Sequence, residues 1–577
     1  MPARTGLLPL LLTLSLPALL AACSPSVDSR SAILVTLDTT RFDALGSYGA
    51  SPSVTPNLDR IAGESLRYEW ARTTAPMTLP AHASILTGLY PPRHTVRGNG
   101  PMTLPPAAAT LAEEARDAGF QTAGFVASLA LDRAYGIAQG FETWSQPDPW
   151  VERPDAADFH EQISDRPAQD VTDAARAWLR DRDRSRPFLL WIHLFDPHAP
   201  YEPPAVFLER AGGDPYLGEV AAMDAALGDL FGDLQRERLL ERATLCVVAD
   251  HGEGRGDHGE ESHALLCYDS TLRVPLLLRY ADGYRAGEAA REPVTVADLF
   301  PTLLEAMGLA VPPALDGQTL WRRTSDAGRG VYFESYYGWT TFGWSPLSGW
   351  ADDDGKYLHS SQPQHFRPRE DPKELREVAA TPSELERYRK AIAAAAGAPA
   401  IASGPRKEVD PAARAPLEAL GYVAAASATS ELPGPLEDLD RPEARSRLED
   451  LAEYNRALAL VRGGKLGEAA GMLEDLAERN PWSVLVLDLR AEALERQGNL
   501  AAAVEVLNER LRLPPEQIAT HHALVRCHGS LGNLDLARRH TLRALELFIQ
   551  AHERRGEPEL AQRYRELLEK ARGGETR

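Results

Sequence analysis

Cysteine, positive charge and long uninterrupted apolar runs are all scarce in this sequence of 577 residues. Four cysteines are too few for a disulfide framework. The 62 Lys and Arg residues are outnumbered by 83 Asp and Glu residues, and the net charge of −21 argues against nucleic acid or an anionic membrane surface as the main partner. The chain is too long to fold around a single hydrophobic core, so we expect two or three domains.

An apolar run near the N-terminus, LLPLLLTLSLPALLAAC, is short and interrupted by prolines. These features are typical of a secretory signal rather than of a membrane-spanning helix. Its end, from Leu20 to Cys23, is similar to the lipobox of bacterial lipoprotein signals, in which cleavage precedes a cysteine that becomes lipidated. We therefore expect residues 1–23 to be a lipoprotein signal and the chain to be exported, on the periplasmic or cell-surface side, with a lipid on Cys23 in the membrane. Ordinary cleavage or an uncleaved anchor is the alternative.

Three apolar segments each end at an aspartate: AILVTLD at Asp38, PFLLWIHLFD at Asp196 and ATLCVVAD at Asp250. Continuous apolarity over this length predicts strands buried on both faces of a mostly parallel sheet. Ligands bind at the carboxyl edge of such sheets, so three carboxylates are expected around one crevice. The pattern AAATLAEEARDAG predicts a helix closed by Gly119, and FQTAGFVA predicts a further strand.

The C-terminal part differs in composition and has an internal repeat. Segments rich in Ala, Pro, Gly and Ser predict a linker over residues 426–442. Beyond it, GKLGEA, GNLAAA and GNLDLA begin at Gly464, Gly498 and Gly532, and this regular spacing is similar to the tetratricopeptide repeat. We expect an all-α solenoid over residues 443–572 that recruits a protein partner or positions the rest of the chain. A generic bundle of helical hairpins is the alternative.

The stretch VVADHGEGRGDHGEESHALLCYDSTLRVP has the densest set of ligand-type side chains. Asp250 and His251 stand at the end of a strand, and His258 and His263 follow in a loop rich in glycine and carboxylates. Carboxylate beside imidazole is a ligand set of Zn²⁺ or Mn²⁺, and glycines let the backbone approach an ion. The stretch therefore predicts a metal site.

Two other strand ends add polar residues to the same edge. Asp38 is followed by Thr39, although Asp and Thr are also common helix caps. In IHLFDPHAPYEPP, Asp196 and His198 stand two residues apart at the mouth of the strand. His193 lies within the strand, where a packed or supporting role is more typical than ligation.

The stretch TTAPMTLPAHASILTG presents Thr78 on a proline-flanked turn at the start of a predicted helix, where backbone N–H groups attract an anion. A hydroxyl is a weak nucleophile unless a base or a metal lowers its pKa. A divalent ion held by Asp and His does so, and a second ion neutralises charge on the transferred group. The ligand-type side chains are numerous enough to hold two divalent metal ions. We expect Zn or Mn rather than Ca or Mg.

From about Ser31 to Val423 these motifs, in this order, resemble the sulfatase branch of the alkaline phosphatase superfamily. The resemblance rests on LDTTRFDALGSYG, TPNLDRIAGES, LPAHASILTGLYPPRHTVRGNG, HLFDPHAPYEPP, ADHGEGRGDHGE and TLRVPLLL. It implies that residues 31–425 form a catalytic α/β domain with a central mixed β-sheet flanked by helices. It also implies a divalent-metal site and an anionic ester as substrate.

The nucleophile position departs from the sulfatase pattern, in which Cys or Ser stands before x-Pro-x-Arg and is oxidised to formylglycine. Thr78 and His82 occupy the matching positions here, and threonine cannot become formylglycine by that route. The lysine expected before RVP matches His263. This pattern resembles the phosphodiesterase and phosphoglycerate-mutase relatives, in which Thr or Ser attacks phosphorus directly.

Carried over position by position, the resemblance implies that Asp38, Asp250 and His251 hold the ion that activates Thr78. Thr39 would be a neighbour or further ligand of that ion.

The second ion would be held by Asp196, His198 and His263. Three residues are implied to contact the oxygens of the substrate, and the first of them also to act in catalysis: His82, Arg93 and Asn99. A helix-end or ion-pair role is the alternative for Arg93.

The leading hypothesis is a metal-dependent hydrolase or transferase that acts on a phosphate, phosphonate or sulfate ester through a covalent intermediate on Thr78, with phosphorus esters ahead of sulfate. The alternative enzyme is a true sulfuric ester hydrolase without formylglycine. The alternative from another class is a non-catalytic binding module whose repeats recruit a protein.

Overall fold

The computed structural model describes residues 30–99, 102–147, 166–323, 329–401, 432–514, 516–554 and 558–573. The expected signal segment with Cys23 lies outside the described residues, as do residues 402–431, which contain the end of the expected catalytic domain and the start of the expected linker.

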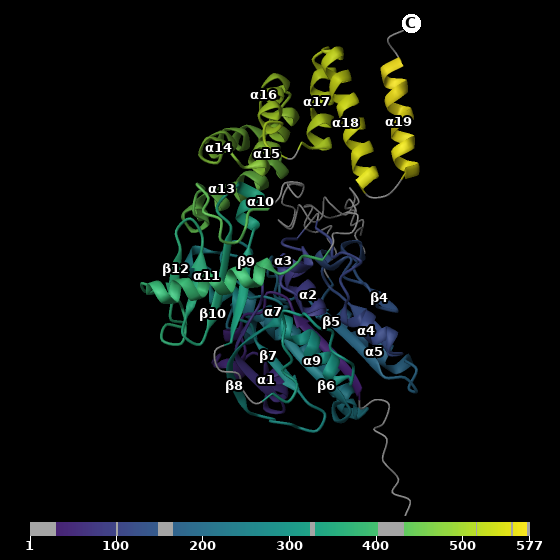
Figure 1. The fold of residues 1–577 in the computed structure, drawn as a ribbon, viewed down its shortest axis with the longest axis vertical. Helices are drawn as coiled ribbons and strands as arrows, with labels where there is room; N and C mark the ends of the chain where they lie inside the picture. Colours follow the sequence, from purple (N-terminus) through teal and green to yellow (C-terminus); the bar gives the residue numbers. More distant parts are fainter. Residues whose placement is uncertain are drawn as a thin grey trace, which may run out of the picture.

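A mixed eight-stranded sheet lies at the centre of the α/β domain, in the order β4-β3-β5-β1-β6-β7-β2-β8 (Figure 1). The three strands that end at an aspartate are neighbours: β1 pairs in parallel with β5 on one side and with β6 on the other. Every residue of these three strands is buried, as their continuous apolarity predicts. The expected mixed α/β sheet is therefore confirmed. The strands are β1 (Ser31–Leu37), β2 (Leu66–Arg72), β3 (Gln121–Phe125), β4 (Thr143–Ser145), β5 (Phe188–Leu194), β6 (Ala243–Ala249), β7 (Leu276–Arg279) and β8 (Ala289–Thr295).

Helices cover both faces of this sheet. α4 and α5 both pack on β3 and β5. On one face, α4 also packs with α2 and α9. On the other face, α5 packs with α7, and α7 contacts α1 and α6. The predicted helix ending at Gly119 is α4, which begins with a capping box at Thr110 and is followed by Gly119 in the left-handed region. The helices of this domain are α1 (Pro56–Gly63), α2 (Thr78–Thr87), α3 (Pro91–His94), α4 (Leu111–Asp117), α5 (Ala168–Asp181), α6 (Ala205–Arg210), α7 (Pro215–Arg236), α8 (Asp269–Leu272) and α9 (Leu299–Ala306).

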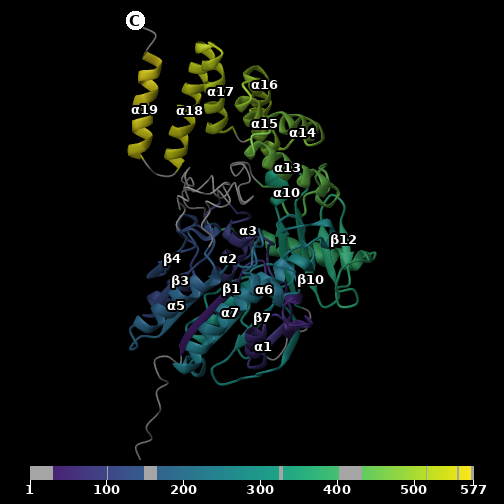
Figure 2. The same ribbon diagram turned by 180° about the vertical axis from the view of Figure 1, so that it is seen from behind.

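A second, antiparallel sheet has the order β12-β11-β10-β9 and lies between the large sheet and the C-terminal helices (Figures 1 and 2). Lys356 on this sheet is buried and donates to Asp269 of α8 and to Glu374. The elements are β9 (Gly330–Ser335), α10 (Tyr337–Phe342), β10 (Leu347–Asp352), β11 (Lys356–His359), β12 (Gln364–Phe366) and α11 (Pro382–Gly397).

The C-terminal region is an array of helices in which each packs against the next. Gly464, Gly498 and Gly532 have φ of 73°, 82° and 76° in the turns between helices, and this left-handed conformation explains the repeated glycine. The all-α region is confirmed, and its assignment to the tetratricopeptide repeat stays a prediction. The helices are α13 (Leu448–Arg462), α14 (Leu466–Arg479), α15 (Val484–Arg496), α16 (Leu500–Arg510), α17 (Ile518–Ser530), α18 (Leu534–Arg554) and α19 (Pro558–Gly573).

The array is joined to the α/β domain by a shared core rather than by a free tether. The Trp344 indole N–H donates to Asn480 Oδ1 at 2.8 Å, and the Ser483 hydroxyl donates to the Thr341 carbonyl at 3.1 Å. One hydrophobic cluster contains residues of β9 to β12 together with residues of α13 to α17. Even the described part of the expected linker is bonded to the domain, because the Tyr336 hydroxyl donates to the carbonyl of Pro433.

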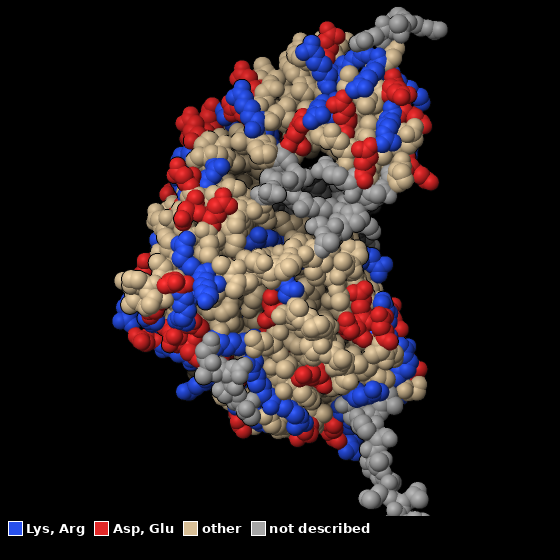
Figure 3. All heavy atoms as spheres, viewed as in Figure 1, with Lys and Arg blue, Asp and Glu red and all other residues tan. Residues whose placement is uncertain are grey.

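In the part of the chain that the structure describes, no helix has the length and apolarity needed to cross a membrane. On the face seen in Figure 3, basic and acidic side chains are interspersed over both the domain and the helical array. This face therefore carries no broad basic surface.

Candidate active site

The ends of β1 and β6 bring Asp38 and Asp250 together, as expected for adjacent parallel strands. Both side chains are fully buried. Asp250 Oδ1 accepts hydrogen bonds from the backbone N–H groups of Thr39 and His251, at 3.3 and 2.7 Å. His251 Nε2 lies 3.7 Å from Asp38 Oδ1 and 3.5 Å from Asp250 Oδ2.

Two buried oxygen atoms beside His251, Asp38 Oδ1 and Asp250 Oδ2, have no hydrogen-bond partner in the described protein. The buried hydroxyl of Thr39, a residue whose φ is 47°, has none either. Burial raises the pKa of both carboxyls, and the neighbouring Asp38 raises that of Asp250 further. Orphaned buried oxygens beside an imidazole fit a divalent cation, which would supply the missing positive charge, and Asp38, Asp250 and His251 have the spacing of a metal-binding group.

Thr78 is the first residue of α2, and its hydroxyl oxygen lies 3.5 Å from His251 Nε2. The helix start predicted there is confirmed, and Thr78 is fully buried. Asn99 Oδ1 accepts from the Leu79 N–H at 2.8 Å, which satisfies one free donor of the helix start. The amide nitrogen of Asn99 is buried without a partner and is available to a substrate oxygen.

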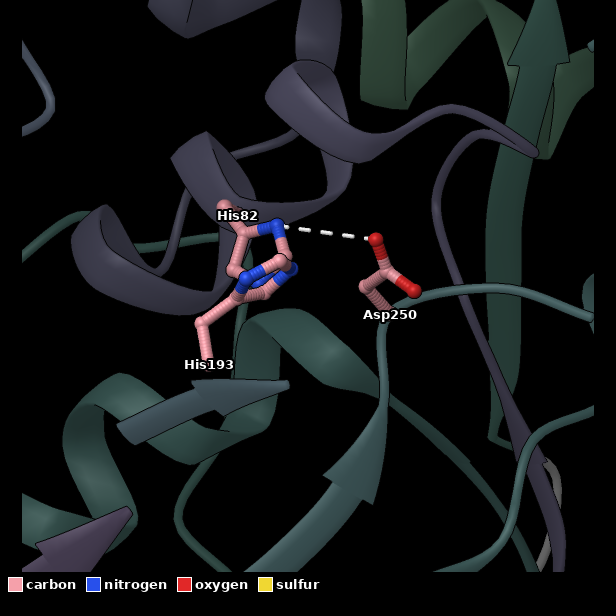
Figure 4. Close-up of side chains that lie close together, drawn as sticks. All are labelled: His82, His193 and Asp250. Atoms are coloured by element: carbon pink, nitrogen blue, oxygen red, sulfur yellow. Dashed lines mark ion pairs between the residues drawn. The ribbon is translucent and has the colours of Figure 1, made fainter. Parts of the chain in front are cut away.

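His82 and His193 lie behind this site and turn toward Asp250 (Figure 4). His82 Nδ1 donates to the Thr78 carbonyl at 2.7 Å, and its Nε2 lies 3.0 Å from the Thr36 hydroxyl. His193 Nε2 lies 3.1 Å from Asp38 Oδ2, which matches the supporting role expected for this histidine. Burial lowers the pKa of both histidines to about 3, so both rings are neutral. The protein itself engages both nitrogens of His82, so we interpret this residue as positioning Thr78 rather than contacting substrate.

A second group of side chains lies on the other side of His251. The His263 ring is 4.5 Å from that of His251 and 5.2 Å from that of His198, between ring centroids. His263 Nδ1 lies 3.2 Å from Glu253 Oε1, and the Tyr201 hydroxyl donates to Glu253 Oε2 at 3.0 Å. Burial lowers the pKa of His263, but the carboxylates of Glu253, Asp38 and Glu260 together outweigh burial and leave it raised.

Glu253 is fully buried at this site and was not among the residues predicted from the sequence. It stands in the motif DHGE, two residues after His251, so a signal was present. Glycine-rich loops place side chains irregularly, and spacing alone does not separate Glu253 from the other carboxylates of that loop.

Two residues predicted at the site are engaged elsewhere. Asp196 Oδ2 accepts from the backbone N–H of Ala168 at 2.9 Å, at the start of α5, where Pro167 offers no side-chain cap. Asp196 is therefore a helix cap here and not a ligand beside His198. Arg93 donates to the Ala314 carbonyl and pairs with Asp316 at 3.1 Å, so its structural alternative is the one observed.

Residues 30–309 match the family model described as Sulfatase. The uncharacterized sulfatase YidJ of Escherichia coli is 25% identical to the chain, over 59% of this chain and 82% of its own length. The comparisons therefore show that this domain is similar to sulfatases.

Solved structures share the fold of this sulfatase-like domain. One is a protein in complex with its substrate D-glucosamine-2-N,6-O-disulfate, with 19% identity and a TM-score of 0.55 over 64% of this chain and 98% of that chain. Another is the phosphonate monoester hydrolase of Agrobacterium radiobacter, with 20% identity and a TM-score of 0.54 over 64% of this chain and 95% of that chain. The alkaline-phosphatase-like sheet expected from the sequence is thereby supported, and the domain has the fold of these hydrolases.

Proposed function

We propose that the protein hydrolyses or transfers a phosphate or phosphonate ester through a covalent intermediate on Thr78. The observation that supports this most is the Thr78 hydroxyl at the start of α2, beside His251 and the unpartnered oxygens of Asp38 and Asp250. A phosphonate monoester hydrolase is among the proteins of similar fold.

Asp38, Asp250 and His251 would hold one divalent ion, Zn or Mn, with Thr39 beside it. Such an ion lowers the pKa of a nearby hydroxyl and neutralises charge on the ester oxygens. A second ion would need His198 and His263, with Glu253 in place of Asp196.

The side chains of this protein would then carry out the attack on phosphorus, the binding of the substrate and the positioning of the nucleophile. The Thr78 oxygen attacks phosphorus as its hydroxyl loses the proton, and the bond from phosphorus to the leaving oxygen breaks as that oxygen gains a proton. Water, or an acceptor alcohol, then attacks the same phosphorus and restores Thr78. The Asn99 amide and the backbone N–H of Thr78 donate to the oxygens of the transferred group. His82 and His193 hold the Thr78 carbonyl and Asp38 in place.

The test is a screen of aryl phosphonate, phosphodiester, phosphomonoester and sulfate substrates against the purified protein with Mn²⁺, Zn²⁺, Ca²⁺ or Mg²⁺. We expect turnover of a phosphorus ester and a phosphorylated Thr78 peptide by mass spectrometry. Thr78→Ala is expected to abolish turnover and the adduct, whereas Thr78→Ser, which keeps a hydroxyl, retains part of the activity. A Thr78→Ala variant with full activity overturns the nucleophile assignment.

Sulfate-ester hydrolysis without formylglycine is the second candidate, and the Sulfatase family match favours it. Sulfate release that depends on Thr78, with no turnover of phosphorus esters, would identify it. Elemental analysis without stoichiometric Zn or Mn, together with no turnover, would instead favour a non-catalytic binding module.

The proposal also includes export of the protein, a lipid on Cys23 and a protein partner bound by the helical array. The lipobox-like LAAC supports the lipid, and the array supports a partner, because stacked helical hairpins offer extended binding surfaces. Membrane fractionation of wild type and Cys23→Ser tests the anchor, and release of the variant from the membrane is the expected result.

A further inference from the structure

Three histidines meet between α17 and α18 of the helical array, away from the candidate active site. His521 and His528 stand two turns apart on α17 and are 3% and 5% exposed. His540 reaches them from α18: His521 Nδ1 and His540 Nδ1 are 2.9 Å apart, and the rings of His528 and His540 are parallel with centroids 5.6 Å apart. Two helices of the array thus share an imidazole cluster, in which His521 and His528 are buried and His540 is half-buried.

The hydrogen bonds around this cluster fix where one proton lies. His521 Nε2 lies 2.9 Å from Glu516 Oε1, and Arg543 of α18 pairs with the same carboxylate. A carboxylate only accepts, so His521 carries its proton on Nε2 and directs the Nδ1 lone pair at His540. His528 Nδ1 is buried and has no partner in the described residues. A buried polar atom without a partner requires an explanation.

We propose that His521, His528 and His540 bind one divalent transition-metal ion, with Zn²⁺ as the best match. Imidazole nitrogens suit Zn²⁺, Cu²⁺ and Ni²⁺, whereas Mg²⁺ and Ca²⁺ prefer oxygen. A carboxylate on the far nitrogen of a ligating histidine is the usual outer support of such sites, and Glu516 supplies it.

Little movement is needed for two of the three ligands. Nitrogens bound to one Zn²⁺ at about 2.0–2.1 Å in a tetrahedron lie roughly 3.3 Å apart, so the facing pair opens slightly while the His540 proton moves from Nδ1 to Nε2. His528 joins by turning its ring out of the stack. The ion would join α17 to α18 and stabilise the end of the array.

The experiment is a Co²⁺ titration of the full chain, followed by visible absorbance, with Zn²⁺ displacement to obtain the zinc affinity. Asp250→Asn with His251→Ala serves as the background, so that the candidate active site does not compete. We expect one ion per chain with a tetrahedral Co²⁺ spectrum. His540→Gln should abolish binding, and Glu516→Gln should weaken it about 10- to 100-fold.

His522→Ala is the matched control, since His522 is an exposed neighbour on the same helix and should leave affinity unchanged. If the double variant does not fold, the bound metal of wild type is compared with that of His540→Gln, and a loss of one equivalent is expected. No bound ion in the array, or binding that His540→Gln leaves intact, overturns the proposal. The proposal is also overturned if the unfolding temperature of the protein depends on pH but does not change when metal is added. None of these outcomes depends on turnover at Thr78.

Discussion

Asn99 does two separate things at the start of α2. Its Oδ1 accepts from the Leu79 N–H, and its unpartnered amide nitrogen is free to donate to a substrate oxygen. Asn99→Asp keeps the acceptor and removes the donor, so we expect kcat/KM to fall about 10²- to 10³-fold with little change in thermal unfolding. Asn99→Ala removes both and should also lose about 0.5–2 kcal/mol of stability. Steady-state kinetics beside calorimetry separates the two effects, and wild-type kcat/KM in Asn99→Asp would refute the donor role.

Glu260, in the loop that carries His251 and His263, makes stability depend on pH. Burial raises its pKa to about 8 from an ordinary 4.5, against the opposing effect of hydrogen bonds from the N–H groups of Leu266 and Leu265. The native carboxyl keeps a proton that the unfolded chain loses, so this contribution to stability is full below about pH 4.5 and is lost as pH rises through about 8.

Glu260→Gln stays neutral at every pH and takes up no proton on folding. Between about pH 5 and pH 8, the free energy of unfolding should therefore fall more steeply in wild type than in the variant, by up to about 1.4 kcal/mol per pH unit. Denaturant unfolding at several pH values measures both slopes. Parallel slopes would show that Glu260 is ionised in the native protein.

At the scale of elements, the apolar pattern of the sequence was sufficient for β1, β5 and β6. Their buried runs predicted a parallel core, and Asp38 and Asp250 meet where the strands end. The same rule was wrong for Asp196, because a strand end places a residue at an edge without fixing its direction, and the uncapped start of α5 takes that carboxylate. Glu253 was missed for a related reason: irregular loop backbone, and not periodicity, directs its side chain into the site.

The junction between α10 and α14–α15 depends on one buried amide. Asn480 accepts from the Trp344 indole and donates to Asp450 Oδ2 at 2.9 Å, and it is fully buried. Asn480→Ala leaves the Trp344 indole N–H without an acceptor, whereas Asp450 keeps its pairs with Arg447 and Arg479. We therefore expect a loss of about 1–3 kcal/mol in the free energy of unfolding. Amide exchange should rise at both ends of the junction. Asn499→Ala, at an exposed position directly before α16 where the side chain makes no capping hydrogen bond, is the control and should change neither quantity.

For the whole molecule, the array and the loop of the candidate active site form one structure. Leu448 at the start of α13 lies against Gly259, where even an added methyl group would be 3.0 Å from the leucine side chain. Leu265, Leu266 and Tyr268 of the same loop belong to the hydrophobic cluster shared with the array. The first helices of the array therefore help to hold His251, Glu253 and His263.

Shortening the chain at two points tests this coupling. In helical arrays each unit contacts mainly its neighbours, so a chain ending at Pro514, which lacks α17 to α19, should keep the metal affinity and activity of the candidate site. A chain ending at Pro442 removes every helix of the array from α13 onward and exposes the part of the shared core on β9 to β12. We expect its metal affinity to fall by at least about tenfold, because a loosened loop has to be ordered by the ion. Calorimetry with and without Mn²⁺ compares the two: the longer chain should show the metal-dependent rise in unfolding temperature of the full protein, and the shorter one a smaller rise. An equal rise in both would show that the α/β domain holds its metal loop without the array.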